Sequence, residues 1–169
     1  LKRIGFQFAT RSGLSIGADD MVIPKEKEQI VENANKIIIE INSQYQNGLI
    51  TDEERYLHTI KVWSLAKSEI TTAMVKSIKE NNDLHYMINS GARGNWGQVT
   101  QLCGMKGLVA NHAGKTIELP IKSNFKEGFT ILEYFIATHG GRKGKSDTAL
   151  KTAEAGYLTR RLVDAVQDI

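Results

Sequence analysis

A set of small, aromatic and cationic residues near the C-terminus repeats with the spacing of one side of an α-helix. Its members stand at i, i+3, i+4, i+7, i+8 and i+11: Ala149, Thr152, Ala153, Gly156, Tyr157 and Arg160. Small side chains let another molecule approach a helix backbone, a tyrosine ring can stack on a base, and an arginine can pair with a phosphate. Crossing helices also use small residues at their contact, so this stripe leaves nucleic-acid contact and helix packing both open.

Gly156 is the costly member of the stripe, because glycine inside a helix is about 1 kcal/mol less favourable than alanine. Either close packing or bending must justify it. The opposite side of the same helix has an apolar character that is typical of a packing face, with Ala155, Leu158, Leu162 and Ala165. We expect this helix to run over residues 146–167.

Two glycine-rich basic segments are candidates for phosphate contact. In the first, Gly140, Gly141 and Gly144 surround Arg142 and Lys143. Glycine-rich loops with cations can hold phosphate, although this spacing matches neither a P-loop nor a dinucleotide fingerprint. The glycines predict a loop that interrupts the helical pattern, and a hinge is as good an interpretation as a phosphate site. The same two interpretations apply to the segment 90–94 around Arg93.

Other chemistry is weakly represented. The single cysteine, Cys103, excludes a disulfide within the chain, and together with His85, His112 and His139 it shows no zinc-ligand spacing. The adjacent acids Asp19 and Asp20 are typical of a solvated turn. No paired carboxylates or nucleophile–base pair stand out, so we expect neither a catalytic residue nor a metal site in this chain, and the chain does not resemble a complete enzyme.

Charge is unevenly distributed along the 169 residues, whose net charge is +3. Residues 24–83 contain 8 Lys and Arg against 10 Asp and Glu, whereas residues 86–126 contain 5 against 1 and residues 139–169 contain 6 against 4. The basic excess predicts a polyanion near the C-terminal half.

No apolar run approaches the roughly 20 residues that span a bilayer, and the N-terminus has no signal-peptide pattern and no Met. We expect a cytoplasmic protein that is a piece of something longer.

The elements that would position these residues are mainly helical. After a lead segment, 1–23, Pro24 suits a helix start, and Ile30, Ala34, Ile37, Ile41 and Tyr45 recur at helical spacing before Asn47-Gly48. Thr51 and Glu54 form a capping box, and a second stripe follows with Tyr56, Ile60, Trp63, Ile70 and Met74. The short loop predicts an antiparallel hairpin over 24–83, with Ile37 and Ile41 packed near Trp63.

The segment 84–138 has an irregular pattern. We expect a short helix within 98–108, an extended stretch over 109–123 with a short strand at 117–120, and a return to helical spacing over 125–138. The fold class is therefore mainly α: a helical hairpin, an irregular middle with a short β element, and a long C-terminal helix in the segment 139–169.

The most specific signals are motifs that follow one another through the chain. They are 51–56 (TDEERY), 90–94 (SGARG), 101–102 (QL), 104–108 (GMKGL), 120–121 (PI), 124–128 (NFKEG), 133–135 (EYF), 142–144 (RKG), 147–153 (DTALKTA) and 156–164 (GYLTRRLVD). In this order they resemble a middle segment of the bacterial-type RNA polymerase largest subunit, β′. Gly141, where alanine is usual, is one of the few departures.

The resemblance implies that the chain is an internal fragment of a larger multi-domain subunit. Segment 24–83 is similar to the rim helices of the secondary channel, 84–138 to the funnel and F-loop, and 139–169 to the bridge helix. It further implies that Thr152, Ala153, Gly156, Tyr157 and Arg160 face template DNA, that Gly140, Gly141 and Gly144 form a hinge, and that Arg93 faces the route of incoming nucleotides.

The implied enzyme is a DNA-directed RNA polymerase, a nucleotidyltransferase that makes RNA from nucleoside triphosphates. Its implied partners are the β, α, ω and σ subunits, DNA, RNA and factors that bind at the secondary channel. Magnesium would be bound by residues outside this chain. Two alternatives are a stand-alone helical module that binds nucleic acid through its basic half, and a structural hairpin that docks partners through its acidic helices.

Overall fold

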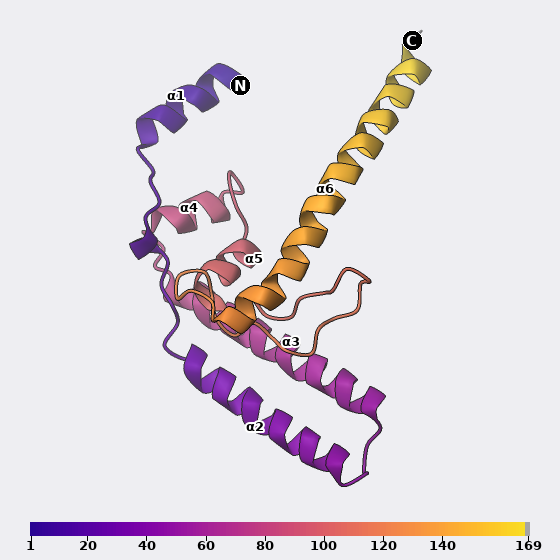
Figure 1. Cartoon of the computed structure of the whole chain (residues 1–169). Coiled ribbons are helices and arrows are strands. Elements are labelled where there is room, and N and C mark those ends of the chain that lie inside the picture. Colours follow the sequence, from indigo (N-terminus) through magenta and orange to yellow (C-terminus); the bar gives the residue numbers. More distant parts are fainter. Residues whose placement is uncertain (168–169) are drawn as a thin grey trace.

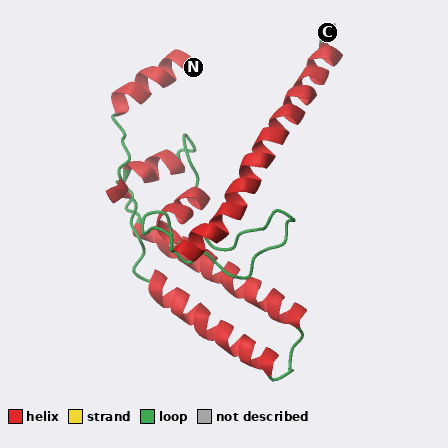
Figure 2. Ribbon diagram, in the orientation of Figure 1, coloured by secondary structure: helices red, strands yellow, loops and turns green. Residues whose placement is uncertain are grey.

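The computed structural model describes residues 1–167, in which helices are joined by loops (Figures 1 and 2). Two isolated β-bridges lie within the loops. The chain begins with α1 (Lys2–Ser12), which ends at Gly13 in the left-handed conformation, φ 64°. A single 3₁₀ turn, Ala18–Asp20, follows. No residue of α1 is buried, and its apolar side chains Ile4, Phe6 and Phe8 are all exposed.

The predicted hairpin is confirmed. Helix α2 (Lys27–Gln46) packs along α3 (Asp52–Ser77), and the loop between them contains Gly48 at φ 74° (Figure 1). The predicted capping box is also present, since the Glu54 amide donates to Thr51 Oγ1 at 3.3 Å and the Thr51 amide donates to Glu54 Oε2 at 2.8 Å. These bonds satisfy amides at the start of α3 that have no partner within the helix.

One expected contact of the hairpin is wrong. Ala34, Trp63, Ala66 and Ile70 form the buried core with the partly buried Ile38, whereas Ile37 is 45% exposed. Ile41 is buried, but it does not belong to the cluster that contains Trp63. Three consecutive isoleucines, 37–39, point in three directions around α2, so periodicity does not decide which of them meets α3.

A second cluster forms where α3 ends. It combines Met74 and Ile78 with Leu84 and Ile88 from α4 (Asp83–Asn89), a helix that the sequence did not predict. Asn82 caps α4 by accepting from the Leu84 amide at 2.8 Å. The short helix α5 (Trp96–Val99) then continues into a π-helical turn, Thr100–Gly104, so the helix expected within 98–108 is present but starts earlier and ends at Gly104.

The segment 105–129 has irregular structure with two antiparallel bridges, Gly107 with Ile121 and Ala110 with Thr116. The short β element is therefore present, but no strand forms at 117–120. The backbone bends at residues 118 and 119, and Pro120 has no amide to donate, so the pairing does not continue through this stretch.

The long helix α6 (Ile131–Val166) contains the largest departure from expectation. The loop predicted at Gly140, Gly141, Arg142, Lys143 and Gly144 does not exist, because all five residues lie inside this helix of 36 residues. Each glycine costs about 1 kcal/mol relative to alanine. A capped start and a buried first part offset that cost. Beyond Ala137 no described side chain of α6 is buried, and the helix extends away from the others (Figure 1).

Within residues 1–167, no helix combines the length and the apolar character that crossing a membrane requires.

Candidate nucleic-acid interface

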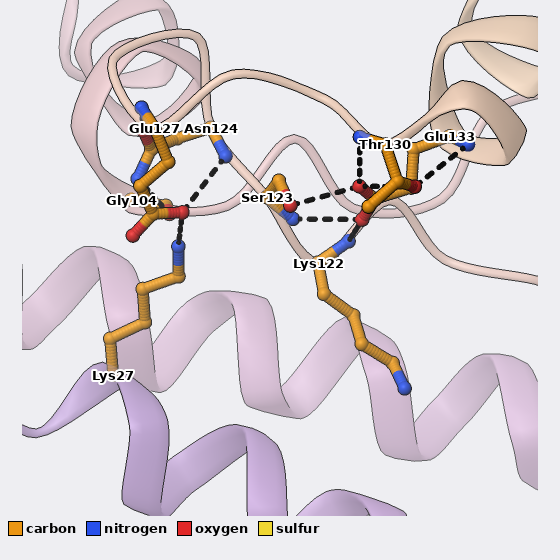
Figure 3. A network of polar contacts seen from close by, with 8 residues as sticks. All are labelled: Lys27, Gly104, Lys122, Ser123, Asn124, Glu127, Thr130 and Glu133. Carbon is orange, nitrogen blue, oxygen red and sulfur yellow. Dashed lines mark hydrogen bonds and ion pairs between the residues drawn. The ribbon is translucent and has the colours of Figure 1, made fainter.

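The start of α6 is fixed by one carboxylate. Thr130 is the N-cap, and its amide and hydroxyl both donate to Glu133 Oε2 at 3.0 Å, while the Glu133 amide donates to Thr130 Oγ1 at 3.3 Å (Figure 3). This is a second capping box. It begins two residues after the motif at 124–128 and was readable from the sequence as Thr130-x-x-Glu133.

The same carboxylate also holds the preceding segment. Glu133 Oε1 accepts the amides of Lys122 at 2.9 Å and Ser123 at 3.1 Å, and Oε2 accepts the Ser123 hydroxyl at 2.9 Å. Burial raises the pKa of Glu133, but the hydrogen bonds from Thr130 and Ser123 outweigh that effect and lower it to about 2. Glu133 is therefore a charged acceptor of five hydrogen bonds.

Two lysines connect this junction to the hairpin. The Lys122 ammonium donates to Asn35 Oδ1 on α2 at 2.8 Å and lies 5.3 Å from the centre of the Trp63 ring on α3. The buried Lys27 at the start of α2 pairs with Glu127. Lys122 lies in the segment just before α6 and reaches α2, whereas Lys27 lies on α2 and reaches that segment, so the base of α6 is tied to α2 at two points. Figure 3 shows the contact made by Lys27.

Asn124 organises the loop that contains Glu127. Its side chain is fully buried, and Asn124 Nδ2 donates to the Gly104 carbonyl at 3.2 Å while Asn124 Oδ1 accepts the Glu127 amide at 2.8 Å. Buried amide groups are costly unless they are hydrogen-bonded, and here both ends of the side chain are bonded.

Close packing fixes the next two turns of α6. Ile136 and Ala137 are buried in a cluster with Val109 and Ile121. A Cβ atom added to Gly140 would lie 2.8 Å from Val109 Cγ1, so only glycine allows the helix to approach this loop. Gly140 is thus a packing residue, while Gly141 and Gly144 have open space around them.

The predicted stripe lies on the exposed part of α6. Thr152, Ala153, Gly156, Tyr157 and Arg160 are all exposed, and a Cβ atom at Gly156 would meet nothing within 4 Å. Thr152 Oγ1 donates to the Thr148 carbonyl at 2.7 Å, so this hydroxyl is already satisfied within the helix. The stripe is a surface of low relief on which a flat partner can lie close to the backbone.

Two arginines frame this surface. Arg160 lies 3.7 Å from Asp164 in an exposed ion pair, which contributes little to stability and leaves the guanidinium available to another anion. Arg161 lies 5.7 Å from the centre of the Tyr157 ring. The sequence analysis did not single out Arg161, although its i+4 spacing from Tyr157 places it on the same side of the helix.

The other predicted cations lie elsewhere. Arg142 and Lys143 line a hollow of about 280 Å³ with His112, His139 and Asp147. Arg93 is exposed in the turn between α4 and α5, where Gly91 and Gly94 have φ values of 71° and 77°. Arg93 lines a separate hollow together with Gly94, Asn95 and Gln98. The structure therefore does not bring Arg93 together with Arg142 and Lys143.

Among residues 1–167, no group of three or more His, Cys, Asp or Glu side chains is arranged to hold a metal ion.

Comparison with known proteins shows which family the chain is similar to. Residues 50–126 match the family model "RNA polymerase Rpb1, domain 4", and residues 128–169 match "RNA polymerase Rpb1, domain 5". All 169 residues align with the DNA-directed RNA polymerase subunit β′ of Pelotomaculum thermopropionicum at 52% identity, of Geobacillus kaustophilus at 54% and of Bacillus subtilis at 53%. The chain spans 14% of the length of each of these relatives.

Proposed function

Since the chain belongs to the family of DNA-directed RNA polymerase β′ subunits, we propose that it works as an internal segment of such a subunit in transcription. The observation that carries the proposal is the sequence identity of 52–54% to β′ subunits, in alignments that include all 169 residues. Both domain matches also occur in the expected order. The activity belongs to the assembled enzyme, a nucleotidyltransferase that joins nucleoside triphosphates on a DNA template.

The template-facing surface in this proposal is the stripe Thr152, Ala153, Gly156, Tyr157 and Arg160. Its support is physical: the stripe is exposed, it is flat around Gly156, and it combines an aromatic ring with cations. Stacking on the ring and pairing with Arg160 suit a nucleic-acid strand. The anchored base of α6 supplies the rigid support that a positioning helix needs.

Helix α6 takes part in translocation by bending, and the bend lies near Gly140, Gly141 and Gly144. The favoured positions are Gly141 and Gly144, because they have open surroundings and glycine weakens a helix locally. Gly140 marks the end of the packed part of α6. Arg142 and Lys143, at the same place, are candidate contacts for phosphates of the nucleic acid.

The hairpin of α2 and α3 lines the secondary channel and is the docking arm for factors that bind there. The remaining partners are the β, α, ω and σ subunits, DNA, RNA and nucleoside triphosphates, and the compartment is the cytoplasm. The magnesium of the complete enzyme would be bound by residues outside this chain.

The experiment for the stripe is single-round elongation on a defined template by the assembled enzyme. Gly156→Ala introduces no clash and stabilises the helix by up to about 1 kcal/mol. If bending or close approach of nucleic acid uses this position, Gly156→Ala changes elongation rate or pausing, because a stiffer helix shifts the balance of its conformations.

The matched control is Ala155→Gly, which loosens the same turn on the opposite side of α6. If Gly156→Ala elongates and pauses like the wild type, the proposed role of this position fails, and Gly156 serves only to pack against another subunit.

Arg93 is the proposed attraction point for incoming nucleotides. A cation beside their route raises the local concentration of triphosphates, so Arg93→Ala raises the apparent KM for nucleotides by a fewfold with little change in kcat. Steady-state kinetics in low salt measures this, and Arg93→Lys keeps the wild-type KM. An unchanged KM for Arg93→Ala in a normally assembled enzyme contradicts the role.

A further inference from the structure

A hollow with mostly apolar walls lies between the hairpin and the base of α6. Its volume is about 430 Å³, and its walls come from α2, α3, the segment 118–122 and residues 130–136. Sites for small molecules usually have volumes of about 300–1,000 Å³ and mostly apolar walls. Ile38, Trp63, Leu132 and Ile136 supply such walls here.

The charges in this hollow cancel. Arg55 donates to Glu118 at 2.6 Å and also binds Asp52, and Glu133 is saturated by its five hydrogen bonds. The Lys122 ammonium donates to the neutral Asn35 Oδ1. The two cations and two carboxylates of the walls have a formal charge sum of zero, so a charged ligand would lose its hydration without a net attraction, and an uncharged ligand fits this hollow better.

Two polar side chains in the hollow have no side-chain hydrogen bond among residues 1–167. Thr59 Oγ1 is buried without a partner, on a residue that is 5% exposed, and the half-buried Asn42 amide also lacks one. An unpaired buried hydroxyl costs on the order of 1–3 kcal/mol. Thr59 lines the hollow, so a ligand there can supply a partner for its hydroxyl.

We propose that this hollow, lined by Asn42, Thr59 and Trp63, is a binding site for a compact, uncharged, planar heterocycle with adjacent hydrogen-bond donor and acceptor atoms. The Asn42 amide offers one donor group and one acceptor, which match such an edge in pairs, and Thr59 offers a second point. The apolar walls take the ring. None of the residues of the α6 stripe lines this site.

A ligand bound in this hollow would contact α6 directly, because residues of α6 form part of the wall. The ligand would lie against Leu132 and Ile136 on α6 and against Ile38 and Trp63 on the hairpin. A molecule bound between them changes the orientation of the base of α6 relative to the hairpin, and this change alters the rate of elongation. This last consequence rests on the proposed function, whereas the binding site itself does not.

The test uses the assembled polymerase and 7-azaindole as the probe, with binding followed by saturation-transfer NMR. Indole has the same shape without the ring acceptor, so we expect it to bind about threefold to tenfold more weakly, the range of one hydrogen bond. In Asn42→Leu this difference between the two probes disappears. Asn33→Leu, an exposed change on the same helix, keeps it.

Thr59→Val replaces the hydroxyl by a methyl group of the same shape, and we expect it to weaken 7-azaindole binding without blocking the site. Failure of 7-azaindole to bind the wild type, or binding that Asn42→Leu and Thr59→Val both leave unchanged, overturns the site. Elongation is then measured with bound probe in the wild type and in Asn42→Leu. Confirmed binding with no change in elongation overturns only the link to α6.

Discussion

Glu133 accepts more hydrogen bonds than any other described carboxylate in the segment 122–133 at the start of α6. A single ionised side chain accepts from two consecutive amides before the helix, from the N-cap amide and from two hydroxyls. Bonds to a charged acceptor are stronger than neutral ones. The direction in which α6 leaves the hairpin therefore depends on the charge of this residue.

This dependence predicts a pH effect on stability. The pKa of Glu133 is lowered from 4.5 to about 2 in the folded chain, so its contribution is fully present above pH 4.5 and is lost as the pH falls toward 2. At pH 7, Glu133→Gln should lower the free energy of unfolding by on the order of 1–2 kcal/mol, after discounting for the partial exposure of the carboxylate.

Urea unfolding of the chain at several pH values measures this effect. The deficit of Glu133→Gln relative to the wild type should shrink between pH 4.5 and pH 2. Glu69→Gln, a change of an exposed glutamate on α3 without a side-chain hydrogen bond, is the control and should show no such trend. A deficit that is constant over this range would assign the loss to shape rather than to charge.

At the scale of elements, α6 is one helix with two environments. Its first turns are capped and packed against Val109 and Ile121, and the remainder is exposed. Gly140 lies in the packed part of α6, and Gly156 lies in the exposed part. At Gly140 a methyl group would meet Val109 Cγ1 at 2.8 Å, whereas at Gly156 it meets nothing.

Alanine at these two positions should therefore have opposite effects. Gly156→Ala should stabilise α6 by up to about 1 kcal/mol, whereas in Gly140→Ala the same gain is outweighed by a clash costing about 1–3 kcal/mol. Thermal unfolding followed by circular dichroism measures both. The double variant Gly140→Ala, Val109→Ala removes the obstacle and should cost less than the sum of its single changes. Equal stabilisation by both alanines would contradict the packing role of Gly140.

The hairpin could be predicted from sequence because local signals agree there: two stripes, one capping box and a glycine turn. The continuity of α6 could not. Three glycines around Arg142 and Lys143 have the local signature of a break, and the helix persists because Thr130 and Glu133 cap it and Val109 packs on it. That contact joins residues 31 positions apart in the sequence, which local propensity does not register.

The candidate site divides in the same way. The exposed stripe followed from helical spacing alone, and the structure leaves it exposed. The contacts that hold the base of α6 could not be predicted from helical spacing, because Lys122 bonds Asn35 at a separation of 87 residues and Lys27 bonds Glu127 at a separation of 100. Each of these lysines resembles an ordinary surface cation in the sequence.

At the scale of the whole molecule, buried residues gather in three clusters. One joins α2 and α3, one joins the end of α3 to α4 and α5, and one holds the base of α6. None of them includes a residue of the last 29 positions of α6, from 138 to 166. An isolated helix of this kind, with four glycines, is marginal in water, because most helical stability in proteins comes from tertiary packing.

This division predicts where the chain gains order when it assembles. In the isolated chain, amide hydrogens over residues 144–166 should exchange within seconds, while those over residues 59–74 of α3 should be protected at least a hundredfold more strongly, because buried Trp63, Ile70 and Met74 hold that helix. In the assembled polymerase, residues 144–166 should become protected as the apolar side with Leu158 and Leu162 packs against other subunits. Hydrogen exchange read by mass spectrometry compares the two states with α3 as the internal control. Strong protection of 144–166 in the isolated chain would show that α6 needs no partner to stay folded, and would remove the reason for assigning that apolar side to subunit packing.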